Sequence, residues 1–198
     1  MEHNKQKPNI QAAEHAIFDF LRALGLDPEN DPTLSETPSR MTEAFNTDLL
    51  AGYAVDLAKL FADGSETNGG GQAEIVALTG ISVTTICPHH LMPALGRATV
   101  AYLPGSRLLG IGTLSRLVDA FARRLTLQEK IGEHVVTALV EHGGALGAYC
   151  ELRLSHTCLS ARGARQTEAE LITVAKAGAF SDPERIGELR LALERATA

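Results

Sequence analysis

The sequence predicts an α+β protein in which an antiparallel sheet carries a pair of helices on one face. Apolar residues first recur at helical spacing and then, after a Gly-rich stretch, at the alternating spacing of strands. Two consecutive helical patterns follow, and further strand-like stretches come after them. Because the strands come in pairs on either side of these helices, they can join into one sheet that the helices cover.

The chain begins with a polar stretch without periodicity, so residues 1–9 are expected to be a disordered tail. A first amphipathic helix follows, with apolar residues from Ala13 to Leu24 on one side. Gly25 is expected to end it, since glycine is the usual residue just past a helix. Residues 10–72 are therefore interpreted as an N-terminal helical region that ends in a linker.

A second helix is expected to start with Thr37 as the N-cap residue and Pro38 at the first helical position. Its apolar stripe is expected to end near Gly52. Residues 63–72 are rich in glycine and polar side chains and lack the spacing of a phosphate-binding loop, which indicates a plain linker.

The catalytic domain is expected over residues 73–198. Residues 74–86 and 97–103 alternate between apolar and polar types and contain many β-branched side chains, which is typical of strands. The residues from Cys87 to Pro93 then form the connection of a hairpin. Functional residues often lie on such loops, because a rigid sheet positions them.

The rest of the chain alternates helix and strand. Ser115 is expected to cap a helix, Thr126 interrupts the pattern, and a second helix continues to His142. Two strands and a terminal helix follow, the helix starting at Pro183 after the capping residue Asp182. The expected strands are residues 147–154 and 170–174.

Composition excludes several function classes. The chain has 198 residues, 44% of them hydrophobic, which suits one globular domain with an appendage. The net charge of −6 makes nucleic acid an improbable partner. Neither a signal peptide nor an apolar run long enough for a membrane is visible. Three cysteines do not form a disulfide framework, so a reducing, cytoplasmic location is expected.

Two short clusters combine cysteine and histidine where strand-like runs end. Cys87 and His90 have the Cys-x-x-His spacing that lets one turn present two ligands, and Cys158 can supply a third from a distant strand. Thiolate and imidazole are ligands that Zn²⁺ prefers, and catalytic zinc sites keep three protein ligands and one open position. The sequence therefore predicts a zinc site at Cys87, His90 and Cys158.

Two histidines beside these ligands, His89 and His156, are suited to proton transfer because imidazole titrates near neutral pH. The alternative is that the cysteines are ordinary buried residues and the histidines lie on the surface. The occurrence of both clusters at strand ends favours the metal site. The third cysteine, Cys150, alternates within a strand and is interpreted as a core residue.

Motifs spread over residues 37–193 resemble the GTP cyclohydrolase I family. They occur in family order and at family spacing. They are Thr37-Pro38-Ser39-Arg40, Cys87-Pro88-His89-His90-Leu91, Ala101-Tyr102-Leu103-Pro104, Leu117-Val118 with Phe121-Ala122-Arg123-Arg124, Gln128-Glu129, His156-Thr157-Cys158 with Ala161-Arg162-Gly163, and Gly178-Ala179-Phe180. The resemblance implies the tunnelling fold and a ring of subunits, decamer-like, with active sites where subunits meet.

The resemblance also implies an activity, the zinc-dependent opening of the guanine imidazole ring of GTP to give dihydroneopterin triphosphate. The resemblance implies that Cys87, His90 and Cys158 hold zinc. It also implies that His89 and His156 move protons. A second group recognises the substrate, with Glu129, helped by Gln128, at the guanine edge and three arginines at the phosphates. The arginines are Arg40, Arg116 and Arg162, and guanidinium groups suit phosphate oxygens.

The chain departs from the family pattern around the phosphates. Where the family presents a Ser-Lys pair, this sequence has Gly112 and Thr113. Glu43 stands where a basic residue is expected, and Pro88 replaces an acid of the metal loop. Since a charged hydrogen bond is worth about 1.5–3 kcal/mol, these changes are expected to weaken triphosphate binding.

Four interpretations follow. The chain is a divergent GTP cyclohydrolase I, or a paralogue that hydrolyses a guanine- or pterin-like ring with fewer or no phosphates. A nitrile-reductase-like oxidoreductase with Cys87 as nucleophile is a third reading, and a non-catalytic binding subunit of the same fold is the fourth. The Cys/His/Cys set and the spare histidines favour the hydrolases.

Overall fold

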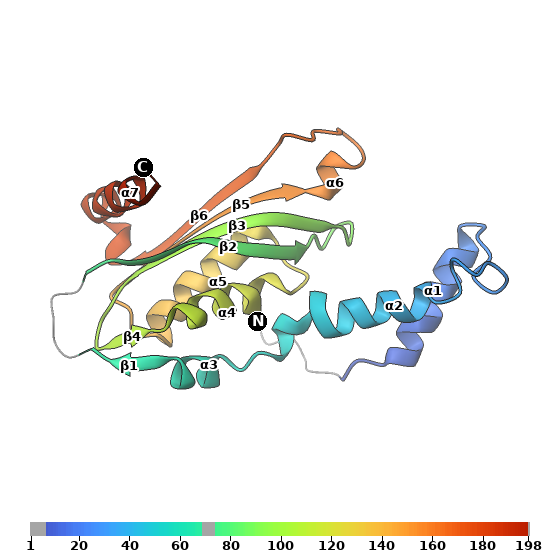
Figure 1. Cartoon of the computed structure of the whole chain (residues 1–198), viewed down its shortest axis with the longest axis horizontal. Coiled ribbons are helices and arrows are strands. Elements are labelled where there is room, and N and C mark those ends of the chain that lie inside the picture. The colour runs from blue at the N-terminus through green and yellow to red at the C-terminus, as the bar shows by residue number, and fades with distance from the viewer. Residues whose placement is uncertain (1–6, 69–73, 198) are drawn as a thin grey trace. The chain divides into compact units, whose positions relative to one another are not determined.

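The computed structural model describes residues 7–68 and 74–197 (Figure 1). It divides into two compact units, one ending at Ala51 and one beginning at Gly52. This boundary precedes the expected linker, because the second unit includes α3 (Leu57–Asp63) and β1 (Ser65–Thr67). Strand β1 pairs with β4 (Arg107–Leu109), so part of the predicted linker is a strand.

The N-terminal unit contains α1 (Ile10–Ala23), α2 (Thr37–Glu43) and the π-helical turn η1 (Ala44–Leu49). Asn9, placed in the predicted tail, instead caps α1, because its side chain accepts a hydrogen bond from the backbone N–H of Ala12. Residues 1–6 of that tail lie outside the described residues. Gly25 follows the helix with a φ of +81°, as expected for a residue that ends a helix.

The start of α2 differs from the prediction by one residue. Glu36 is the N-cap residue, and Thr37 already lies in the helix. No side chain caps this end; instead, the Ser39 hydroxyl donates to the carbonyl of Glu36. Pro38 lies in the first turn, as predicted, since its fixed φ and missing N–H are tolerated there.

Four antiparallel strands form the main sheet of the second unit (Figure 1). They are β2 (Val76–Ile86), β3 (Pro93–Leu103), β5 (Gly147–His156) and β6 (Leu171–Gly178), in the order β2-β3-β5-β6. The predicted α+β class with an antiparallel sheet is therefore confirmed. Strands β3 and β6 are longer than predicted, because pairing with β5 continues to the ends of both.

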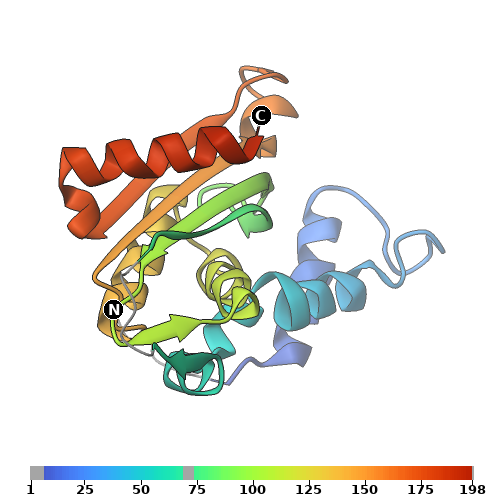
Figure 2. The same ribbon diagram turned by 60° about the vertical axis from the view of Figure 1, so that its left-hand side comes forward.

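Two helices, α4 (Ile111–Ala122) and α5 (Gln128–Glu141), cover one face of this sheet (Figure 2). They bury a continuous apolar core that includes Leu117, Ile131 and Cys150, each fully buried. The prediction that Ser115 caps α4 is wrong, because the helix begins four residues earlier. There Gly110 is the N-cap residue, and the Thr113 hydroxyl donates to the carbonyl of Gly64.

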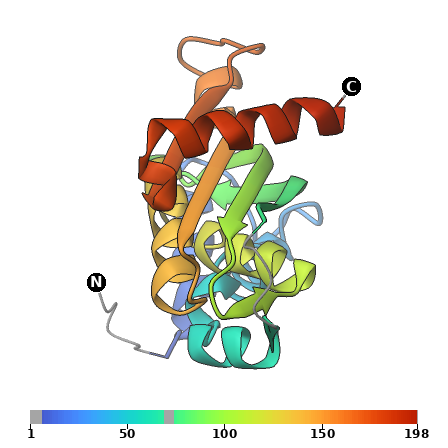
Figure 3. The same cartoon turned by 90° about the vertical axis from the view of Figure 1, so that its left-hand side faces the viewer.

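The opposite face carries the 3-10 turn η3 (Ala179–Ser181) and α7 (Pro183–Thr197), which cross the strands in Figure 3. Leu189 packs there against Ala101, Leu103 and Tyr149, the alternate side chains of β3 and β5. As predicted, Asp182 begins the helix, its carboxylate accepting from the N–H of Glu184. Each face of the sheet thus has a helix packed against part of it, while Leu95 on β3 and Ile172 and Val174 on β6 stay exposed. The two outer strands are left as edges.

Two short elements complete the chain, the 3-10 turn η2 (Ala51–Ala54) and the single turn α6 (Thr157–Ser160) that follows β5. Among residues 7–68 and 74–197, no helix combines the length and the apolar character that crossing a bilayer requires.

Candidate metal centre and active site

The loop between β2 and β3 presents the first cysteine–histidine cluster. The Cys87 N–H donates to the carbonyl of Met92, and the Leu91 N–H donates to the carbonyl of Cys87. Leu91 has a φ of +52°, a conformation that non-glycine residues seldom adopt. This tight turn fixes the backbone of Cys87 and of the two histidines that follow it.

The end of β5 brings the second cluster to the same place. Ala94, at the start of β3, pairs with His156, and β5 passes directly into α6, which carries Cys158. The Thr157 hydroxyl donates to the carbonyl of Pro93 at 2.6 Å and joins the two segments. Antiparallel pairing therefore converges residues that are about seventy positions apart, as the sequence prediction required.

The three predicted ligands lie close together. One ligand atom each from Cys87, His90 and Cys158 falls within 4.8 Å of the other two. Cys87 Sγ lies 4.0 Å from Nδ1 of His90 and 3.9 Å from Nδ1 of His89. Two thiols and one imidazole match a catalytic zinc site, which keeps a fourth position open, so these residues fit the metal.

The sulfur atoms also influence each other electrostatically. Burial, together with the neighbouring thiol of Cys87, raises the pKa of Cys158, while the cation Arg162 lies close enough to oppose this shift. Two thiolates held this close to each other are unfavourable without a compensating charge. A divalent cation supplies that charge, which is a second reason that the site fits a metal.

His156 is held by a buried glutamine. Its Nε2 lies 2.9 Å from Oε1 of Gln128, whose side chain is only 2% exposed. Burial lowers the pKa of His156, and the carboxylate of Glu129 opposes this shift. The structure thus places His156 beside Gln128 and within electrostatic reach of Glu129. No sequence signal indicated that Gln128 is buried.

Glu129 is exposed in the first turn of α5. It lines a groove of about 660 Å³ between α5 and β6, together with Glu133, Thr173 and Lys176. This groove lies next to the first turn of α5, where Gln128 contacts His156. A carboxylate in such a groove can accept two hydrogen bonds from a planar donor pair.

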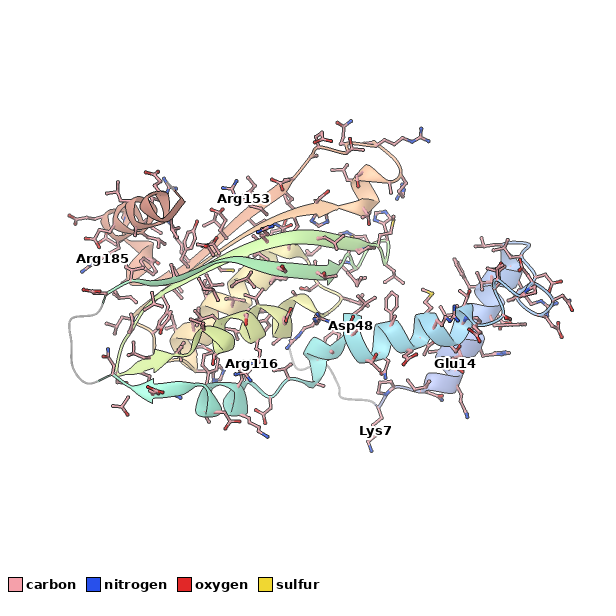
Figure 4. All side chains as sticks on the ribbon, in the orientation of Figure 1. Lys7, Glu14, Asp48, Arg116, Arg153 and Arg185 are labelled. Atoms are coloured by element: carbon pink, nitrogen blue, oxygen red, sulfur yellow. The ribbon has the colours of Figure 1, made fainter. Side chains whose placement is uncertain are left out.

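The three predicted phosphate-binding arginines lie on or just beyond separate elements. Arg116 is exposed on α4, where its Nε donates to the carbonyl of Gly112 (Figure 4). Arg40 belongs to the N-terminal unit and pairs with Glu36. Arg162 is exposed just beyond α6 and close enough to Cys158 to affect its thiol.

The departures from the family pattern differ in their surroundings. Thr113 is 1% exposed, and its hydroxyl is bonded to the carbonyl of Gly64. Gly112 is exposed, and a Cβ added there would meet nothing within 4 Å. Glu43 is exposed at the end of α2 in the N-terminal unit. Sequence reasoning gave no role to Leu91 and Thr157, which shape the metal loop, although both lie within the family motifs.

The fold and the site together define the class: an α+β protein whose antiparallel sheet presents a Cys₂His ligand set next to an imidazole suited to proton transfer. The model of one family, GTP cyclohydrolase I, matches residues 13–193. The chain belongs to the GTP cyclohydrolase I family, as the motifs indicated.

Curated relatives agree with this assignment. The GTP cyclohydrolase 1 of Leifsonia xyli subsp. xyli is 38% identical over 176 residues, which cover 89% of this chain and 91% of the relative. That of Chromobacterium violaceum is 37% identical over 185 residues, or 93% and 88% of the two chains. That of Rickettsia bellii is 31% identical over 180 residues, or 91% and 92%.

A search of solved structures finds the apo archaeosine synthase QueF-Like, at 18% identity and a TM-score of 0.42. The match covers 52% of this chain and 93% of the other.

Proposed function

We propose that this chain is a zinc-dependent cyclohydrolase that opens the guanine imidazole ring of GTP at C8, releases formate and forms 7,8-dihydroneopterin triphosphate. The observation that carries the proposal is the convergence of Cys87, His90 and Cys158 within 4.8 Å, in a chain of the GTP cyclohydrolase I family. The reaction class is hydrolysis of a cyclic amidine. This family membership favours hydrolysis over the nitrile-reductase alternative.

Cys87, His90 and Cys158 would hold the metal. A zinc ion bound there supplies a Lewis acid that lowers the pKa of water toward neutrality. Thiolate ligands also fit a reducing compartment such as the cytoplasm, because they must stay reduced to bind.

His156 and His89 are proposed to move the protons. One imidazole takes a proton from the attacking water, and an imidazolium returns one to the departing ring nitrogen. Ring opening consumes one water and gives a formamide, whose hydrolysis consumes a second and releases formate. Rearrangement of the sugar and ring closure then release one water, so the overall reaction consumes one.

Glu129 is proposed to recognise the guanine edge, because a carboxylate can accept from both N1–H and the 2-amino group. Its exposed position in the groove beside α5 supports this role. Arg40, Arg116 and Arg162 are proposed to bind phosphate oxygens.

Assembly into a ring is proposed from the open sheet. Strands β2 and β6 form its two edges, and β6 exposes three apolar residues, Leu171, Ile172 and Val174. An exposed apolar edge strand is a template for pairing with another chain. Residues 73–198 are proposed as the catalytic domain within each subunit.

A second candidate function is hydrolysis of a related purine or pterin with fewer phosphates. The observation that favours it is Thr113, which is buried and bonded within the fold where the family has a lysine. Without that lysine, and with Glu43 where the family has a second basic residue, the site binds a triphosphate less tightly.

One parallel assay distinguishes these functions. The zinc-loaded protein is incubated with GTP, GMP, guanosine and guanine, and formate release and product mass are followed, with His156→Ala as the inactive reference. Turnover of GTP alone supports the first proposal, whereas reaction of only a less phosphorylated substrate supports the second. No formate from any of the four, or equal rates with His156→Ala, would contradict both.

A further inference from the structure

We propose that Gln128 is a positioning residue that holds neutral His156 with its proton on Nε2, so that Nδ1 is the atom that exchanges protons with the substrate. The tautomer follows from contacts within the chain. The step to the substrate rests on the proposed function.

The amide nitrogen of Gln128 is surrounded by acceptors. Its Nε2 lies 3.1 Å from the carbonyl oxygen of Leu152, 2.9 Å from that of Leu171 and 3.1 Å from Oγ1 of Thr173. Backbone carbonyls can only accept hydrogen bonds, so the nitrogen must face them. Exchanging the amide oxygen and nitrogen would set Oε1 against two carbonyl oxygens in a buried place, where unpaired polar atoms are costly.

The orientation of the amide decides the state of the imidazole. With Nε2 directed at the strands, Oε1 of Gln128 faces Nε2 of His156 at 2.9 Å. An amide oxygen only accepts, so the imidazole nitrogen must donate and carries the proton. In a neutral imidazole the other nitrogen, Nδ1, then holds the lone pair.

The fold makes this arrangement rigid. Gln128 is the first residue of α5, and its three acceptors lie on β5 and β6, which pair with each other at Leu152 and Thr173. The side chain is 2% exposed, so water does not compete for it. His156 lies on β5 as well, so one glutamine ties the helix to both strands and to the imidazole.

The consequence is a single route for the proton. A proton taken up at Nδ1 gives the imidazolium, which keeps its Nε2–H bond to Gln128. Returning that proton from Nδ1 to a substrate nitrogen restores the neutral ring without breaking any bond to the protein. Exchange through Nε2 would instead break the bond to the buried amide of Gln128.

This role differs from the help in guanine recognition predicted for Gln128. Both polar atoms of its side chain already have partners in the chain, so it need not contact the substrate. A positioning residue affects kcat, whereas a base-recognition residue also raises KM. The two roles therefore make different kinetic predictions.

The direct test is ¹⁵N NMR of the full chain with labelled histidine rings, at a pH where imidazole is neutral, with His156 assigned through His156→Ala. We expect a single Nε2–H tautomer whose proton exchanges slowly with water. A ring protonated at Nδ1, or a mixture of tautomers, would overturn the proposal. This outcome does not depend on turnover, so it stays decisive even if GTP proves not to be the substrate.

A variant of Gln128 tests whether this residue sets the tautomer of His156. In Gln128→Met, which keeps the length but removes the acceptor, the Nε2 proton should exchange rapidly, and kcat should fall roughly 10- to 100-fold with KM little changed. If Gln128→Met fails to fold, the tautomer measured in the unsubstituted chain still decides the proposal. A rise in KM at constant kcat would show that Gln128 binds substrate instead.

Thr173→Val is the matched control. It removes one acceptor of the Gln128 amide and leaves the two carbonyls that fix the orientation. The Nε2–H tautomer should therefore survive. Loss of this signal in Thr173→Val would mean that the carbonyls do not orient the amide, and the argument for the tautomer would fail.

Discussion

The two halves of the candidate site are held by the fold in different ways. The metal half lies on paired strands: backbone bonds close the Cys87 loop, Thr157 ties it to β5, and Gln128 fixes His156. The proposed phosphate half consists of exposed arginines, of which Arg116 donates to a carbonyl of its own helical turn. One half is preorganised within a single chain, and the other is not.

This difference matches what each chemistry requires. Metal ligands must be placed to within a few tenths of an ångström, which only side chains on a rigid scaffold achieve. Phosphates can be met by long cationic side chains that adjust to the ligand. Substitutions in the phosphate half can therefore change specificity while the metal half keeps its chemistry, as Gly112 and Thr113 suggest.

The largest effect is expected from removing a ligand. Cys158→Ser should lower zinc affinity by more than about 100-fold, because even changes outside the ligand set cost 10- to 100-fold. Formate release should fall to background. Zinc content by mass spectrometry and a chelator competition measure the first effect, and the formate assay measures the second.

The matched control is Cys150→Ala. Cys150 is fully buried on β5, with a pKa raised to about 12 by burial, so its thiol stays protonated. Removing its sulfur should cost about 1 kcal/mol of stability and leave zinc stoichiometry unchanged. If Cys150→Ala lost zinc as Cys158→Ser does, the ligand assignment would be wrong.

A smaller effect tests how rigid the metal loop must be. Leu91 adopts a φ of +52°, which costs of order 1–3 kcal/mol for a non-glycine residue and more for a β-branched one. Leu91→Val should weaken zinc binding about tenfold, whereas Leu91→Gly should retain it, because glycine adopts this conformation without strain. Chelator competition against both variants gives the comparison.

Leu95→Val controls for the loss of an exposed leucine on β3, where β-branched residues are favoured. It should bind zinc as the natural sequence does. Equal affinities for Leu91→Val and Leu91→Gly would mean that the backbone of Leu91 does not control the ligands.

Much of the fold could be predicted from the sequence, because the spacing of apolar residues and the positions of turn residues indicate local structure. The longer helices, the four strands of the main sheet and the α+β class were predicted, whereas α3, α6 and the β1–β4 pair were not. The predicted boundaries were wrong where tertiary contacts set them. Ser115 was predicted to cap a helix, whereas Gly110 is the N-cap residue and the bond from Thr113 to Gly64 anchors the first turn there. Strand β1 was not predicted, because it lies in a Gly-rich stretch and its pairing with β4 is non-local.

The candidate site could be predicted where the residue types themselves indicate a chemistry. Cysteine and histidine at two strand ends indicated a metal, and antiparallel register then brought them together. The surroundings of Gln128 were not predictable, because a glutamine at a helix start is ordinarily exposed. Its burial depends on three acceptors more than twenty residues away in sequence.

In the phosphate half, Arg116→Ala should raise KM for GTP roughly tenfold, since a charged hydrogen bond is worth about 1.5–3 kcal/mol. KM for guanosine should not change. Stability should stay within about 0.5 kcal/mol, because Arg116 is exposed and bonds only a carbonyl of its own helix. Steady-state kinetics with both substrates and a urea titration measure these effects.

Arg153→Ala is the control. Arg153 is also exposed but lies on β5, paired with Glu151 (Figure 4). Its removal should leave KM for GTP unchanged. An equal rise in KM for both variants would mean that overall charge, not a phosphate contact, sets the affinity.

The smallest effect is expected at Gly112, where a new side chain has open space. Gly112→Ser should stabilise the chain by about 0.5 kcal/mol or less, because glycine is a poor helix former. Thr113→Lys should instead destabilise it by about 1 kcal/mol or more, since it breaks a buried bond to Gly64. Urea titrations of both variants measure the contrast. A neutral Thr113→Lys would mean that the bond to Gly64 contributes little to stability. An unchanged KM for GTP in this variant would mean that the missing lysine does not weaken triphosphate binding.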